Sequence, residues 1–243
     1  EDPVSDNEIT VFVRIGTDFR ENYYEYEVPV QITQPGRYPD NTWGRTQVWP
    51  TYNNVEVDLE ALRNVKNKRN QAMLEAGSTI NLQSEFVIQN GKNRIKVKGN
   101  PNLADAQAIM IGVRNPRNDG QPKSVEIWVN ELALTDFIDN GGWAATGRLS
   151  TQLADFANFS ISGSTSKAGF GELGDRMQNR QMENISQYDL STSIELGKFF
   201  PAKANIRLPF YFGYGETFIT PQYNPLDQDI LLKVSLDNPN LSP

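Results

Sequence analysis

Residues 188–196 read YDLSTSIEL, a stretch in which apolar and polar side chains alternate. One parity holds Tyr188, Leu190, Thr192, Ile194 and Leu196, and the other holds Asp189, Ser191, Ser193 and Glu195. Successive side chains of a β-strand point to opposite faces of the sheet. This period of two therefore predicts a strand with one apolar face and one polar face.

Two neighbouring stretches repeat the alternation. Residues 157–162 read ANFSIS, and residues 202–212 read AKANIRLPFYF. We expect the second stretch to form one continuous strand. Strands of about ten residues with this pattern are typical of outer-membrane β-barrels, but a soluble antiparallel sheet with one wet face alternates in the same way. In the barrel interpretation, the residues that face lipid are Ala204, Ile206, Leu208, Phe210 and Phe212.

The N-terminal part contains shorter strand signals. Alternation is clear in residues 9–15 (ITVFVRI) and 24–30 (YEYEVPV), and Pro29 indicates that the second of these is an edge strand. Strand-forming residues 86–88 and 95–97 flank Asn90-Gly91, which predicts a hairpin. Residues 108–113 and 125–129 are expected to form two further strands, whereas residues 33–54 indicate a long loop.

Only one helix is expected. Asp58 is a good N-cap, Leu59, Leu62 and Val65 follow at helical spacing, and Gly77 is a stop signal. Short strands with one helix predict a mainly β protein, with a jelly-roll-like antiparallel β-sandwich in residues 1–140. The composition changes at residues 140–143 (NGGW), and we expect barrel-type strands with connecting loops in residues 141–243.

Composition restricts the possible chemistry. The chain has 243 residues and a net charge of -7, so it gains nothing from counterion release on phosphates, and we expect no nucleic-acid partner. It contains no cysteine and no histidine, which excludes thiolate metal sites, cysteine nucleophiles and Ser-His-Asp triads. We therefore expect no enzyme activity, no catalytic residues, no cofactor and no bound metal.

The chain begins at Glu1 and has no apolar run near the roughly 18 residues that a membrane-spanning helix needs. We expect both of its ends to be cuts within a longer polypeptide.

Three groups of residues are candidates for a site. Glu25 and Glu27 lie two apart on one strand face and could act as paired carboxylates, but we expect them to face water. Asp227 and Asp229 offer oxygen ligands for Ca²⁺, although a capped turn is the simpler interpretation. Exposed aromatic rings stack on planar partners, so an aromatic platform would favour a soluble carbohydrate-binding module as the alternative function. Its residues would be Tyr24, Trp43 and Trp49.

Seven short motifs occur along the chain in the order that is typical of one protein family. They are VFVRIGTDFRENYY (residues 11–24), GNPNL (99–103), IGVRNP (111–116), EIWVNEL (126–132), GWAA (142–145), LADF (153–156) and YNPLDQD (223–229). Together they resemble the SprA/Sov family, the outer-membrane translocon of type IX secretion and gliding motility. One departure is Ala133, where many relatives are expected to carry Arg.

The resemblance implies a piece of an outer-membrane protein-translocation pore, with a structural and cargo-conducting role and a place at the Gram-negative cell surface. The implied partners are other secretion-system subunits, secreted cargo proteins, and the lipid bilayer through the C-terminal strands. A soluble carbohydrate-binding β-sandwich on the cell surface remains the alternative.

Overall fold

The structure is a computed structural model that describes residues 4–116, 121–136, 141–172 and 180–237. The chain forms two compact units, the first made of Glu1–Leu132 with Leu226–Pro243 and the second of Ala133–Pro225. These units divide the chain at residues 132/133 and 225/226, and the sequence predicts one domain boundary near residue 140.

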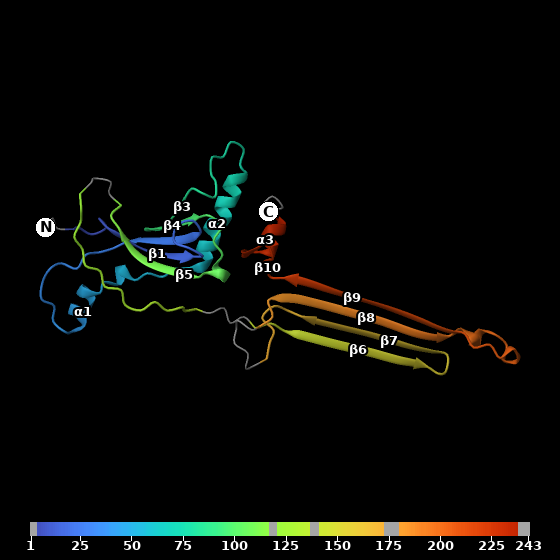
Figure 1. Cartoon of the computed structure of the whole chain (residues 1–243). Helices are drawn as coiled ribbons and strands as arrows, with labels where there is room; N and C mark the ends of the chain where they lie inside the picture. Colours follow the sequence, from blue (N-terminus) through green and yellow to red (C-terminus); the bar gives the residue numbers. More distant parts are fainter. Residues whose placement is uncertain (1–3, 117–120, 137–140, 173–179, 238–243) are drawn as a thin grey trace. The chain divides into compact units, whose positions relative to one another are not determined.

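The first unit is built on a five-stranded antiparallel sheet (Figure 1). Its strands are β1 (Thr10–Gly16), β2 (Tyr23–Pro29), β3 (Phe86–Asn90), β4 (Asn93–Lys98) and β5 (Ala108–Arg114), in the order β3-β4-β2-β1-β5. These strands agree with the sequence prediction, including the hairpin at Asn90-Gly91, where Gly91 has a φ of 59°. The edge position expected for β2 is wrong: Pro29 is the last residue of a central strand, where its missing N–H removes little pairing.

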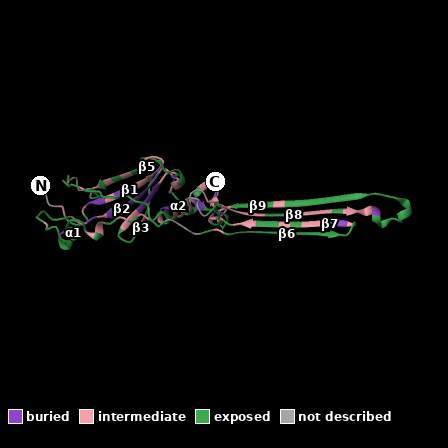
Figure 2. Ribbon diagram, turned by 90° about the horizontal axis from the view of Figure 1, so that it is seen from below, coloured by how far each residue is buried: buried purple, intermediate pink, exposed green. Residues whose placement is uncertain are grey.

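The predicted helix is α2 (Leu59–Leu74). The side chain of Asp58 accepts a hydrogen bond from the backbone N–H of Glu60, and Gly77 beyond its end has a φ of 83°. The helix packs on the apolar face of the sheet. The shared core consists of Tyr24, Tyr26, Val28, Leu62, Val65, Ile95 and Val97. Figure 2 colours all buried residues purple, and they concentrate in this unit.

The expectation of a single helix is wrong. A short helix, α1 (Thr42–Val48), forms within the predicted loop, because the Asn41 side chain caps it by accepting from the N–H of Gly44. Single helical turns occur at η1 (Thr51–Asn53) and η2 (Leu103–Asp105). After the second unit, β11 (Asp227–Leu231) and α3 (Leu232–Asp237) complete the first unit.

The mainly β, antiparallel class is confirmed, and the described residues of the first unit give one sheet covered by α2. The strand expected at residues 125–129 is wrong: described residues 121–136 contain no strand. Alternation alone does not make a strand, because the backbone also needs a partner to hydrogen-bond with. The turn expected at Asp119-Gly120 lies outside the described residues.

The second unit is a four-stranded antiparallel meander in the order β6-β7-β8-β9 (Figure 1). Its strands are β6 (Ala144–Leu153), β7 (Ala157–Ser166), β8 (Glu183–Glu195) and β9 (Pro209–Pro221). The alternating stretches at residues 157–162 and 188–195 form β7 and β8, as predicted. A two-residue strand, β10 (Tyr223–Asn224), lies near the end of the second unit in the sequence.

The continuous strand expected over residues 202–212 is wrong in its first part, because β9 begins at Pro209. Ala202–Ala204 forms a helical turn, η5, after Pro201, and Asn205 adopts a left-handed φ of 46°. Asparagine tolerates this conformation, which a strand cannot contain, so local turn chemistry overrides the apolar alternation here. No helix among the described residues is long and apolar enough to cross a membrane.

Candidate functional site

The four-stranded sheet has two chemically opposite faces. Residues paired across antiparallel strands point to the same face, so the register assigns every side chain. The apolar face contains Leu149, Leu153, Ala157, Phe159, Ile161, Tyr188, Leu190, Ile194, Phe210, Phe212, Tyr214 and Phe218, with Thr151, Thr192, Ser186 and Glu216 among them. The polar face contains Arg148, Ser150, Gln152, Asn158, Ser160, Ser162, Ser164, Gln187, Asp189, Ser191, Ser193 and Tyr211.

Large side chains of the apolar face are open to solvent. Leu149 is 61% exposed and Phe210 is 46% exposed, and Figure 2 shows mainly exposed and intermediate residues along β6–β9. Leaving apolar surface in water forfeits about 25 cal/mol for each Å² that could be buried. An exposed apolar face of this kind is a candidate interaction surface.

The polar face is rich in hydroxyl groups and poor in charge. A shallow groove on it is lined in part by Ser150, Asn158, Ser160, Ser191 and Tyr211. The hydroxyl groups of Ser150 and Ser160 lie 3.1 Å apart across β6 and β7.

Aromatic rings mark one border of the apolar face. The Tyr188 ring lies 6.2 Å from that of Tyr214 and 6.1 Å from that of Phe218, centroid to centroid. The Tyr188 hydroxyl donates to the carboxylate of Glu216 on the same face. Rings with one apolar side and one polar group are typical of a boundary between apolar and aqueous phases.

The predicted lipid-facing residues fall into two groups. Phe210 and Phe212 lie on the apolar face of β9. Ala204, Ile206 and Leu208 are exposed but belong to the loop that joins β8 to β9, and they do not continue the strand.

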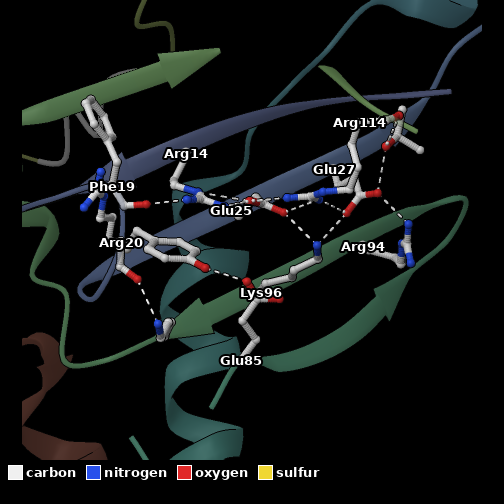
Figure 3. A network of polar contacts seen from close by, with 12 residues as sticks. Arg14, Phe19, Arg20, Glu25, Glu27, Glu85, Arg94, Lys96 and Arg114 are labelled. Carbon is white, nitrogen blue, oxygen red and sulfur yellow. Dashed lines mark hydrogen bonds and ion pairs between the residues drawn. The ribbon is translucent and has the colours of Figure 1, made fainter. Parts of the chain in front are cut away.

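Figure 3 shows a charge cluster on the face of the five-stranded sheet that lies opposite the core. Glu25 and Glu27 on central strand β2 are fully buried, so the expectation that they face water is wrong. The Lys96 ammonium lies 2.7 Å from a carboxylate oxygen of each. Arg114 donates to both carboxylates at 2.7 and 2.6 Å, and Arg14 donates from β1 to Glu25.

This environment keeps both carboxylates ionised. Burial alone would raise the pKa of Glu25, but hydrogen bonds from Arg114, Lys96 and Arg14 outweigh burial and lower the pKa to about 2. For Glu27, burial is likewise outweighed by hydrogen bonds from Lys96 and Thr10, and its pKa is lowered. A general acid needs a raised pKa, so this pair is arranged for cross-strand pairing and not for proton transfer.

Asp227 and Asp229 surround a lysine. The Lys66 ammonium lies 2.8 Å from Oδ1 of Asp227 and 3.6 Å from Oδ2 of Asp229, and it donates to the Pro101 carbonyl. Tyr24 donates its hydroxyl to Asp229 at 2.6 Å. Lys66 thus supplies the positive charge that a calcium ion would bring. The described residues contain no cluster of three or more acidic residues suited to a metal.

The three residues of the predicted aromatic platform do not share a surface. Tyr24 is fully buried in the core, and burial, followed by the Asp229 carboxylate, raises the pKa of its hydroxyl. Trp43 on α1 and Trp49 just after it are 58% and 43% exposed. The Trp43 ring lies 6.4 Å from that of Tyr38.

The motif GNPNL at residues 99–103 forms a tight corner. Gly99 has a φ of 68°, and a Cβ atom there would lie 2.0 Å from the Glu21 carbonyl oxygen. The Pro101 carbonyl accepts from Lys66, and the Asn102 side chain caps η2 by accepting from the N–H of Ala104. These residues position β4 and the Lys66 ion pair.

The sequence prediction missed two parts of these sites. Strand β6 was not identified, because Gly147 and Thr151 dilute its apolar face. The role of Lys66 was missed too, although it follows the buried Val65 at a position where a charged residue is uncommon.

The family model SprA_N, which describes a motility related/secretion protein, matches residues 1–236. A search of curated proteins gives no match. The family match includes all eleven strands of the described residues and residues of both units.

Proposed function

The chain belongs to the SprA_N family of motility related/secretion proteins, and we propose that it forms a wall segment of a protein-translocation pore in the outer membrane. In this proposal the second unit supplies four strands of the wall, and the first unit is a domain joined to them. The role is structural and cargo-conducting, without catalysis.

The observation that carries the proposal is the contrast between the faces of β6–β9. A strand in a membrane barrel needs an apolar face toward lipid and a polar face toward the lumen, while its backbone bonds to neighbouring strands. Leu149, Ile161, Leu190 and Tyr214 lie in one cross-strand row of the apolar face. The next row, on the opposite face, is Arg148, Ser162, Asp189 and Gly215.

Strand length also supports the proposal. The shorter strands, β6 and β7, have 10 residues each. Such a strand rises about 34 Å and, tilted by about 40°, spans about 26 Å of membrane, close to the apolar band of roughly 25 Å in outer-membrane barrels. The outer edges of β6 and β9 would pair with neighbouring strands of the complete protein.

The first unit is proposed to be part of a jelly-roll-like sandwich in the complete protein. Its sheet supplies one layer. The extended residues 125–132 carry exposed Trp128, Val129 and Leu132 and would add to a second layer. Secreted cargo and other secretion-system subunits are the proposed protein partners.

The alternative, a soluble carbohydrate-binding module, depends on exposed rings. The burial of Tyr24 removes one member of that platform and leaves Trp43 and Trp49. A carbohydrate-binding module would also give no role to the apolar face of β6–β9. We therefore favour the pore wall.

The test uses two adjacent residues of β7 that point to opposite faces. In the complete protein, Ile161→Arg should place a charge in lipid at a cost of about 2–4 kcal/mol, whereas Ser162→Arg should be tolerated in the lumen. The readout is the abundance of the protein in outer-membrane fractions together with secretion of its cargo. Equal tolerance of the two substitutions would reject the wall assignment and leave a soluble sheet.

A further inference from the structure

Two connections of the second unit meet at one end of its sheet. Because the strands are antiparallel neighbours, residues 154–156 between β6 and β7 lie at the same end as residues 196–208 between β8 and β9. The Phe156 and Phe199 rings pack edge to face with centroids 5.3 Å apart, which ties the two connections together. The longer one, which we name the basic-aromatic loop, is the orange segment between β8 and β9 in Figure 1.

The basic-aromatic loop is held in a defined shape. The Leu196 N–H donates to the Leu208 carbonyl at 2.8 Å, which closes the loop at its base. The Leu208 N–H donates to the Glu195 carboxylate at 2.7 Å. A Cβ atom on Gly197 would lie 2.2 Å from the Ile206 carbonyl oxygen, so the two arms of the loop are packed together.

The loop presents large apolar side chains to solvent. Phe199 is 71% exposed and Phe200 is 47% exposed. Ile206 and Leu208 are also exposed large apolar residues. These four residues lie in the connection between Ile194 of β8 and Phe210 of β9, both of which belong to the apolar face.

The same loop concentrates positive charge. Residues 196–208 read LGKFFPAKANIRL, with three basic residues and no acidic one, in a chain whose net charge is -7. Lys198 pairs with Asp155 of the neighbouring turn. Lys203 and Arg207 are exposed and form no ion pair among the described residues.

We propose that the basic-aromatic loop is a membrane-interface anchor that binds the phosphate headgroups of anionic lipids. Phe199 and Phe200 enter the boundary between headgroups and acyl chains, where outer-membrane barrels carry girdles of aromatic residues. Lys203 and Arg207 contact the headgroup phosphates, because basic residues beside an apolar membrane segment are attracted to anionic lipids. This inference rests on the proposed wall function, since the adjoining apolar face must already lie in the bilayer.

The loop combines exposed aromatic rings with basic side chains, and this combination favours lipid as its binding partner. An acidic protein surface would satisfy Lys203 and Arg207 but would leave the Phe199 and Phe200 rings without an apolar phase. A membrane interface provides both chemistries at the depth where the strands end. We therefore favour lipid, and binding to an acidic polypeptide becomes an outcome of the test.

The test uses the whole chain with a single reporter. The chain contains no cysteine, so an environment-sensitive fluorophore on Ala202→Cys labels the loop uniquely. The detergent-refolded chain is mixed with vesicles of phosphatidylcholine alone or with about 30% phosphatidylglycerol, and the apparent affinity is read from the fluorescence change. We expect tighter binding to the anionic vesicles.

Charge removal should abolish this preference. The double variant Lys203→Gln/Arg207→Gln should bind anionic vesicles about thirtyfold more weakly, because each basic residue near an anionic surface contributes about fivefold. The matched control, Arg37→Gln/Lys68→Gln, removes two exposed charges from the first unit and should bind like the unaltered chain. Phe199→Ser/Phe200→Ser should weaken binding to both kinds of vesicle.

Contrary outcomes are distinguishable. Unchanged affinity of the Lys203→Gln/Arg207→Gln variant, or capture of the unaltered chain by polyglutamate in preference to vesicles, would overturn the anchor. If Leu149→Ser/Ile161→Ser abolishes vesicle binding while the loop variants bind normally, the anchor fails and the wall assignment survives. If only the loop variants lose binding, the loop contacts lipid without a wall and the proposed function fails.

Discussion

Lys66 of helix α2 and Asp227 of strand β11 form a buried ion pair, with Nζ and Oδ1 2.8 Å apart, although 161 residues separate them in the sequence. The four-stranded sheet lies between them in the chain. Asp229 strengthens the contact by accepting from the Leu103 N–H at 2.8 Å and from the Tyr24 hydroxyl. The pair therefore fixes the point at which the chain rejoins the first unit.

Removing the lysine should release this return segment. Lys66→Met leaves two carboxylates without their cation, and loss of one partner of a buried pair costs about 3–5 kcal/mol. We expect faster tryptic cleavage after Lys233 in α3 and a lower guanidinium midpoint by circular dichroism. Lys68→Met, an exposed position two residues on, is the control and should change neither. A loss below about 1 kcal/mol would mean that apolar contacts such as those of Ile230 hold the segment instead.

The charge cluster predicts a second large loss of stability. Glu25→Gln removes the carboxylate that Arg14, Lys96 and Arg114 share, and leaves those cations close together and partly buried. The expected loss in the free energy of unfolding is about 3–5 kcal/mol. Glu21→Gln breaks the solvent-exposed pair with Lys98 and should cost less than about 1 kcal/mol. Similar losses for the two variants would show that the buried cluster contributes no more than a surface pair.

The same cluster predicts the acid sensitivity of the first unit. The pKa of Glu25 is about 2 in the folded chain, against an ordinary value of 4.5. A depressed folded pKa contributes stability that is present above pH 4.5 and is lost as the pH falls toward 2. The contribution is on the order of 3 kcal/mol, and Glu27 acts in the same direction.

Guanidinium titrations at pH 7, 5, 4 and 3 measure this effect. Stability due to the cluster should be nearly constant between pH 7 and 5 and should decline below that range. In Glu25→Gln the decline should be smaller, because one of the two cluster carboxylates that take up protons on unfolding is gone. An equally steep decline in that variant would assign the acid sensitivity to other carboxylates.

An element can be predicted from the sequence when its own residues carry the complete pattern of that element. Strands β7 and β8 were predictable because each carries its own complete alternation, and α2 because Asp58 and Gly77 mark its ends. Strand β6 was not, since only its pairing with β7 places Leu149 beside Ile161 and reveals its apolar face. The sequence prediction started β9 too early, at residue 202. The apolar and polar residues alternate through this stretch, but the left-handed backbone of Asn205 interrupts the strand.

The charge cluster could not be predicted for a related reason. Glu25 and Glu27 resemble a wet strand face until the register places Arg14 on one side of Glu25 and Lys96 on the other. Those partners come from separate strands. Their approach is set by long-range pairing and not by spacing along the chain.

The corner at Gly99 gives a prediction with an internal control. Gly99 and Gly91 both have left-handed φ values, 68° and 59°, which any other residue adopts at a cost of about 1 kcal/mol. They differ in space: a Cβ atom on Gly99 would lie 2.0 Å from the Glu21 carbonyl oxygen, whereas one on Gly91 would meet nothing within 4 Å.

Gly91→Ala should therefore lower the free energy of unfolding only by the cost of placing alanine at a left-handed φ, about 1 kcal/mol. Gly99→Ala must also push the backbone at Glu21 away and disturb the bond from the Asn100 N–H to Asn22, which is 2.9 Å long. We expect it to lose at least about 2 kcal/mol more than Gly91→Ala in guanidinium denaturation. Equal losses at the two positions would show that the corner yields easily, and that Gly99 is required only for its backbone angle.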